Sequence, residues 1–114
     1  MASVLLVEDE ALIRMMIADM LLDLGHSVAG EASNLASGLS IARTTAADCA
    51  ILDVSLGADS SAPIAEILNN RGVPFTFASG YGSDGIPAGF RERPVLRKPF
   101  TVEELARCLT ILLK

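Results

Sequence analysis

The stretch Ser-Val-Leu-Leu-Val-Glu-Asp at residues 3–9 decides the fold of this chain, because a short apolar run leads directly into two acidic side chains. The run is aliphatic and contains β-branched valines, which favours a strand. Residues 10–24 follow with apolar side chains at helical spacing, and Gly25 is a suitable residue to end that helix. Together these segments predict a strand followed by a helix that covers it.

The same alternation continues along the chain. Further strands are predicted at residues 28–31, 48–52, 73–78 and 94–97, and further helices at 34–44, 62–71 and from 101 onward. Ser61 is a candidate N-cap, and Thr101 followed three residues later by Glu104 predicts a capping box. Residues 80–93 are rich in glycine, so the helix expected there is short, distorted or absent. Five such βα units predict a doubly wound α/β fold with a parallel sheet.

Size and composition narrow the function. The 114 residues fit one domain over positions 1–114, and 51% of them are hydrophobic. A formal charge of −5, without a basic run, disfavours nucleic-acid binding. No apolar stretch approaches the roughly 20 residues that span a bilayer, and no signal peptide is evident, which predicts a cytoplasmic protein without membrane contact. Cys49 and Cys108 are isolated in the sequence and are predicted to be core residues.

Polar side chains stand where the predicted strands end. Glu8 and Asp9 follow the first strand, Asp53 the third, Ser79 the fourth and Lys98 the fifth. Because the carboxyl ends of parallel strands meet at one edge, we expect these side chains to share a crevice. Crowded carboxylates suit Mg²⁺, and without a cation they repel, so removing Asp9 is expected to stabilise the metal-free fold. A carboxylate that lies beside a cation, a lysine and a hydroxyl is typical of a site for phosphoryl transfer.

These motifs, agreeing in order along nearly the whole chain, resemble the response-regulator receiver domain, the phosphoacceptor module of two-component signalling. The resemblance implies a flavodoxin-like (βα)₅ fold with strand order 2-1-3-4-5. It implies that Asp53 is the phosphoacceptor, that Ser79 is the switch hydroxyl and that Lys98 precedes a cis-proline. It also implies a Mg²⁺ site formed by Asp9, Asp53 and the backbone carbonyl of Ser55, with Glu8 acting through water.

The resemblance also implies the partners. A sensor histidine kinase or a histidine phosphotransfer protein would supply the phosphoryl group, and the domain would promote its own phosphorylation and dephosphorylation. A change in residues 80–93 would then control an unidentified output protein, or the chain would act as a phosphate sink. Residues 74–82, Pro-Phe-Thr-Phe-Ala-Ser-Gly-Tyr-Gly, are similar to the motif of single-domain receivers of the Phe-Ala-Thr-Gly (FATGUY) type, with Ser79 in place of threonine.

Two positions depart from the common receiver pattern and leave alternatives open. Val95 stands where receivers commonly carry an aromatic switch residue, and Gly57 stands where many carry proline. A pseudo-receiver that binds a partner without phosphorylation, and a receiver excised from a larger regulator or hybrid kinase, are the alternatives. An aspartyl-phosphate phosphatase is disfavoured because Ser55 replaces its second aspartate. A nucleotide site is disfavoured because acids follow the first strand, where phosphates need amides.

Overall fold

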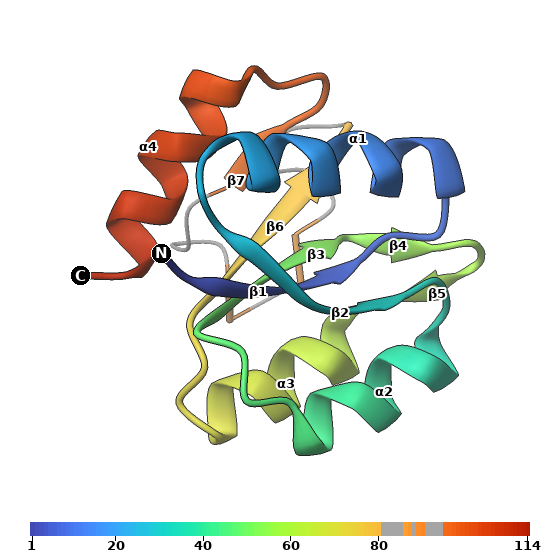
Figure 1. Cartoon of the computed structure of the whole chain (residues 1–114). Helices are drawn as coiled ribbons and strands as arrows, with labels where there is room; N and C mark the ends of the chain where they lie inside the picture. The colour runs from blue at the N-terminus through green and yellow to red at the C-terminus, as the bar shows by residue number, and fades with distance from the viewer. Residues whose placement is uncertain (81–85, 88, 91–94) are drawn as a thin grey trace.

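A five-stranded parallel sheet forms the centre of the molecule in the computed structural model (Figure 1). The structure describes residues 1–80, 86–87, 89–90 and 95–114. The main strands are β1 (Ser3–Val7), β2 (Ser27–Ala32), β3 (Cys49–Asp53), β6 (Phe75–Ser79) and β7 (Val95–Arg97). Their order across the sheet is β2-β1-β3-β6-β7, and every neighbouring pair is parallel. This confirms the predicted order 2-1-3-4-5.

Helices cover both faces of this sheet, as predicted. The helices α1 (Ala11–Asp23) and α4 (Val102–Leu112) lie on one face, and α2 (Leu35–Thr44) and α3 (Ala62–Asn70) lie on the other (Figure 1). The predicted bounds agree with these to within about two residues, which is the usual uncertainty of helix and strand ends. Within the described ranges, no helix is long and apolar enough to cross a membrane.

The strands are held between two hydrophobic cores because alternate side chains point to opposite faces. Leu5 of β1 packs with Phe77 of β6 in the core under α2 and α3, while Leu6 packs with Leu105 of α4 in the core under α1 and α4. All four side chains are fully buried, which is worth about 1.5–3 kcal/mol for each. Cys49 and Cys108 are free and buried in the second core, as predicted. The ends of the strands are therefore fixed by packing.

Two apolar side chains in the segment after β6 are buried in the core. The described residues of this segment contain no helix. Ile86 and Phe90 are buried in the core under α2 and α3. The Phe90 ring packs edge-on against Phe75 and Phe77, with ring centroids 5.5 and 6.0 Å apart. These contacts anchor Phe90 on β6. The rest of the segment predicted to be irregular, residues 81–85, 88 and 91–93, lies outside the described residues.

A short hairpin after β3 was not predicted. Its strands are β4 (Ser55–Leu56) and β5 (Asp59–Ser60), joined by a two-residue turn. Gly57 takes φ +65° in that turn, the first central position of a type II′ hairpin turn, which favours glycine. Ser61 takes the predicted N-cap position of α3, but its side chain makes no cap hydrogen bond. The Ser61 hydroxyl donates instead to the Val54 carbonyl at 3.0 Å, which closes the base of the hairpin.

The capping box at the start of α4 is present as predicted. The Thr101 hydroxyl accepts the Glu104 amide at 3.1 Å, and the Glu104 carboxylate accepts the Thr101 amide at 3.0 Å. A cap of this kind contributes about 1 kcal/mol to a helix. It fixes the start of α4 directly after the loop that carries Lys98.

Candidate functional site

The predicted site residues meet at the carboxyl edge of the sheet. The register pairs Val7 with Leu52 and Ser79 with Arg97, so the residues that follow these strands reach the same edge. A cleft of about 420 Å³ lies there. Every predicted site residue except the buried Glu8 lines this cleft. The full set of lining residues is Asp9, Glu10, Ile13, Asp53, Val54, Ser55, Gly57, Ser79, Gly80 and Lys98. The topology therefore brings together side chains that are up to 90 residues apart in sequence.

Three carboxylates form the acidic part of the cleft. One oxygen from each of Glu8, Asp9 and Asp53 lies within 4.8 Å of the others. Glu8 is 1% exposed, Asp53 is 14% exposed at its side chain and Asp9 is exposed, so the cluster opens from the core to the solvent. Hard, anionic oxygens at this spacing suit Mg²⁺, which keeps some positions for water or substrate oxygens. The donor set fits the predicted cation.

Lys98 ties two of these carboxylates together. Its Nζ lies 2.6 Å from Glu8 Oε1 and 3.2 Å from Asp53 Oδ2. Its backbone amide donates to the Ser79 carbonyl at 2.9 Å, and the following peptide, Lys98-Pro99, is cis, as the resemblance implied. The strand β7 and the Ser79 carbonyl thus hold the lysine beside the acids. A charge-assisted contact of 2.6 Å is short and strong.

Burial and charge shift the pKa values of the cluster. Burial, with Asp53 as a neighbour, raises the pKa of Glu8 from 4.5 to about 7, although Lys98 opposes the shift. Burial alone would lower the pKa of Lys98, but Glu8 and Asp53 outweigh it and raise that pKa. Slight burial would raise the pKa of Asp9, but the neighbouring Glu8 carboxyl and the hydrogen bond from the Gly57 amide outweigh it and lower that pKa. The lysine and Asp9 are therefore charged at neutral pH, while Glu8 is near its midpoint.

The buried Glu8 carboxylate is held at both oxygens. Oε1 accepts from Lys98, and Oε2 accepts from the Glu10 amide at 3.1 Å, just before α1. Arg14 of α1 donates to the Glu8 backbone carbonyl at 2.8 Å. Glu10 occupies the N-cap position without a side-chain cap hydrogen bond, so Glu8 takes up the amide at the start of the helix. These contacts fix the acid that the core partly encloses.

Gly57 is a residue whose contribution to the site was not predicted from the sequence. Its backbone amide donates to Asp9 Oδ2 at 2.9 Å and so connects the hairpin to the end of β1. Ser55, at the start of the same hairpin, is exposed, and its amide lies 3.4 Å from Asp53 Oδ1. A glycine as the first of two residues between short strand-like pairs is the signal that would have indicated the hairpin.

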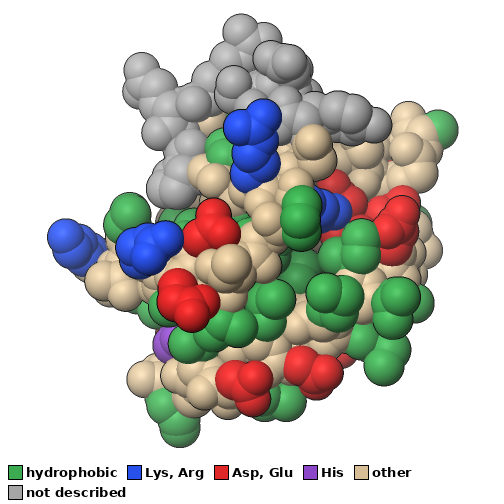
Figure 2. Space-filling view, turned by 90° about the horizontal axis from the view of Figure 1, so that it is seen from above, with side chains coloured by type: hydrophobic (Ala, Val, Ile, Leu, Met, Phe, Trp, Pro, Cys, Tyr) green, Lys and Arg blue, Asp and Glu red, His purple; other side chains and the backbone are tan. Residues whose placement is uncertain are grey.

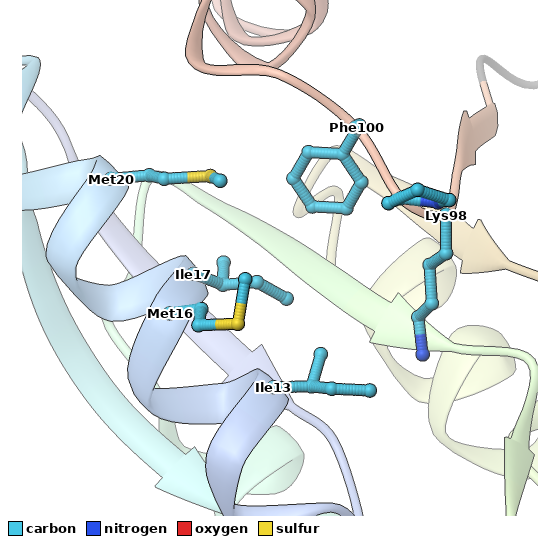
Figure 3. A pocket seen from close by; sticks show the side chains of 7 residues that line it. Ile13, Met16, Ile17, Met20, Lys98 and Phe100 are labelled. Carbon is cyan, nitrogen blue, oxygen red and sulfur yellow. The ribbon is translucent and has the colours of Figure 1, made fainter.

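An apolar surface borders the acidic cleft. A cavity of about 300 Å³ lies between α1 and the loop before α4, and Figure 3 shows Phe100 and Lys98 facing Ile13, Met16 and other α1 residues across it. The outer face of α1 adds hydrophobic side chains that are half or more exposed, and such side chains gather on the face shown in Figure 2. Ile13 and Lys98 line both the cavity and the cleft.

Comparison with known proteins identifies the family. Residues 4–110 match the response regulator receiver domain, and the chain belongs to that family. The transcriptional regulatory protein PdtaR of Mycobacterium tuberculosis is 30% identical over 109 residues, which cover 90% of this chain and 52% of that protein. The chain thus spans about half the length of the curated relatives that it matches.

Two solution structures of SdrG are also similar. SdrG from Sphingomonas melonis Fr1 is 43% identical with a TM-score of 0.88, over 100% of this chain and 98% of that one. The BeF₃-activated conformation of SdrG from Pseudomonas melonis Fr1 is 43% identical with a TM-score of 0.83, over 98% of this chain and 96% of that one. The receiver fold is therefore shared over the whole chain.

Proposed function

We propose that this chain is a phosphorylation-controlled receiver in which Asp53 accepts a phosphoryl group, with Mg²⁺, from a phosphohistidine donor in the cytoplasm. The observation that carries the proposal is the contact of Lys98 Nζ with both Glu8 and Asp53, beside three clustered carboxylates at an open cleft. The donor would be a sensor histidine kinase or a histidine phosphotransfer protein. The BeF₃-activated conformation of the 43% identical SdrG supports a phosphoryl-responsive site here, since BeF₃ mimics a phosphoryl group.

The residues divide the chemistry among them. A carboxylate oxygen of Asp53 attacks phosphorus, the P–N bond to the donor imidazole breaks, and its electron pair stays on the departing imidazole nitrogen. Lys98 offsets the charge on the transferring group, and the Ser79 hydroxyl donates to one of its oxygens. Asp9, Asp53 and the Ser55 carbonyl would hold Mg²⁺ directly and Glu8 through water. When bound, Mg²⁺ would supply positive charge that offsets the negative charge of the transferring phosphoryl group.

The acyl phosphate is reset by water. Water attacks phosphorus, the P–O bond to Asp53 breaks, and inorganic phosphate leaves the carboxylate in its original state. Between these events we propose that residues 80–93 change to control a partner, or that the chain serves as a phosphate sink. Val95, the first residue of β7, replaces the common aromatic switch residue, so the response relies on other side chains. Most of that segment lies outside the described residues.

Phosphorylation by a small donor tests the proposal. The purified chain is treated with acetyl phosphate and Mg²⁺, and its intact mass is measured. We expect a gain of one phosphoryl group that requires Mg²⁺ and is lost in Asp53→Asn. Asp59→Asn is the matched control, because Asp59 is an exposed aspartate of the adjacent hairpin. It should keep the adduct.

Three outcomes would contradict the proposal. A chain that gains no phosphoryl group from acetyl phosphate or from a phosphohistidine donor is a pseudo-receiver. An adduct that survives in Asp53→Asn and disappears in Asp59→Asn would move the acceptor to the hairpin. Steady turnover of a free phosphomonoester would indicate a phosphatase.

A further inference from the structure

The hairpin after β3 places the Gly57 amide against the exposed member of the acidic cluster. Gly57 N–H donates to Asp9 Oδ2 at 2.9 Å across 48 residues of sequence. Asp9 is the exposed member of the cluster, whereas Glu8 is buried and is held by Lys98 and by the Glu10 amide. An exposed carboxylate samples several rotamers unless a donor holds it. The Gly57 amide therefore restrains the carboxylate with the most freedom to turn away from the cluster.

The position of this amide is set by the core. Leu56, one residue earlier, is 4% exposed and packs in the core under α2 and α3. At the base of the hairpin, the amide and the hydroxyl of Ser61 both donate to the Val54 carbonyl at 3.0 Å, and Ser61 is 0% exposed. The hairpin is thus anchored on both sides of its turn. Its amide points at Asp9 from a fixed place.

The turn needs glycine at this position. Gly57 has a backbone φ of +65°, which residues other than glycine rarely adopt, whereas Ala58 does not have a positive φ. Proline, which many receivers carry here, cannot take this φ and has no N–H to donate. The departure from the common pattern therefore comes with a hydrogen bond that a proline chain cannot make.

We propose that Gly57 is a positioning residue for the cation site, and that its amide orients the Asp9 carboxylate for Mg²⁺. This inference rests on the proposed function, because that function assigns Asp9 as a cation ligand. Hydrogen bonds to ligating carboxylates set their orientation, and losing such a partner typically weakens metal binding by about 10- to 100-fold. Since Asp9 is exposed and Asp53 remains in place, we expect about a tenfold loss in Mg²⁺ affinity.

Gly57→Ala and Gly72→Ala form a matched pair of variants. Gly72 has φ +74° at the end of α3, and an added Cβ at either glycine meets nothing within 4 Å. Both substitutions therefore introduce the same kind of backbone strain, and only Gly57 contacts a carboxylate. Mg²⁺ is titrated into each protein while amide chemical shifts are followed by NMR. Alanine keeps the N–H but disfavours the positive φ that aims it at Asp9, so we expect weaker binding in Gly57→Ala alone, while both variants are destabilised toward urea.

A second measurement needs no cation and no change in the hairpin. In the metal-free wild type, the Gly57 amide proton should exchange slowly, and Asp9→Ala should make it exchange at least severalfold faster without affecting the Ser61 amide. Unchanged or stronger Mg²⁺ binding in Gly57→Ala, or unchanged Gly57 exchange in Asp9→Ala, would overturn the inference. A wild type that does not bind Mg²⁺ would instead refute the proposed function.

Discussion

Neutralising Glu8 should change how the stability of the metal-free protein depends on pH. In the folded protein the pKa of Glu8 is about 7, because the side chain is buried beside Asp53, whereas its ordinary value is 4.5. Between these two values the folded protein keeps a proton on Glu8 that the unfolded chain has released. The stabilising contribution is therefore complete below about pH 4.5 and is lost as the pH rises toward and beyond about 7.

The size of the effect follows from that interval. At about 1.4 kcal/mol for each pKa unit, ionising Glu8 in the fold costs up to about 3 kcal/mol. Domains of this size are stable by about 5–15 kcal/mol, so the loss is a large fraction of the total. With the urea dependence usual for small domains, the unfolding midpoint should fall by about 1–2 M between about pH 5 and pH 8.5.

Urea unfolding followed by far-UV circular dichroism, in the presence of a chelator, measures this loss. Glu8→Gln keeps the shape of the side chain but cannot ionise, and all other titrating groups are common to both proteins. Its own cost, one weakened hydrogen bond to Lys98 or to the Glu10 amide, is the same at every pH and cancels in the slope. Parallel pH profiles for the wild type and Glu8→Gln, or a wild type that gains relative stability toward pH 8.5, would refute the reasoning.

Three further variants test the contacts around the site in the metal-free protein. Lys98→Ala leaves the buried Glu8 without its cationic partner and should lower the free energy of unfolding by about 2 kcal/mol near pH 8. The loss should be much smaller near pH 5, where Glu8 is protonated. Urea unfolding measures both values, and adding Glu8→Gln should remove the difference between them. Asp9→Ala should reduce the free energy of unfolding by less than about 1 kcal/mol, because it removes a hydrogen-bonded carboxylate. The melting temperature should therefore fall slightly. Ser61→Ala should cost about 1 kcal/mol in urea unfolding, because one of the two hydrogen bonds to the Val54 carbonyl is lost; an unchanged midpoint would count against the anchoring of the hairpin.

The Asp9 expectation reverses the one that carboxylate crowding alone predicts. From the sequence, three acids at one edge repel, so removing Asp9 should stabilise the metal-free fold. The structure distributes that cost unequally. Glu8 is enclosed and its pKa rises, whereas Asp9 is exposed, is held by the Gly57 amide and has a lowered pKa. A carboxyl with a lowered pKa stabilises the fold when ionised, so the gain is expected from neutralising Glu8.

The main chain topology and the strand-end residues were predictable because they depend on local patterns. Apolar runs of strand length, helical spacing and a capping box each follow from neighbouring residues, and parallel strands necessarily share a carboxyl edge. Lys98 and Asp53 are 45 residues apart in sequence, and their contact was predictable because each follows a parallel strand that ends at this edge. The same reasoning predicts a short, distorted or absent helix in residues 80–93, most of which lie outside the described residues, and of the described ones Ile86 and Phe90 are buried in the core.

The hairpin was not predicted because its sequence shows no periodic pattern of apolar and polar residues. Its strands have two residues each, too short for an alternating pattern, and Ser61 has the residue type of a helix cap. The competing partner, the Val54 carbonyl, lies seven residues earlier in the chain. A hydroxyl takes whichever acceptor the backbone brings near, and only the folded hairpin brings this one. The amide of Gly57 reaches Asp9 for the same reason.

A count of charge in the site indicates that the proposed phosphoryl transfer would require a cation. Asp9 and the Lys98–Asp53 ion pair together carry a charge of −1, and Glu8 near its midpoint brings the four side chains to between −1 and −2. In the proposed function, phosphorylation of Asp53 would replace one carboxylate charge by a phosphate that carries about −1.5 to −2. The lysine offers one positive charge, and it is already shared between two acids. A divalent cation brings the sum to between 0 and +1 before transfer, so an anionic donor then meets a cleft that no longer repels it.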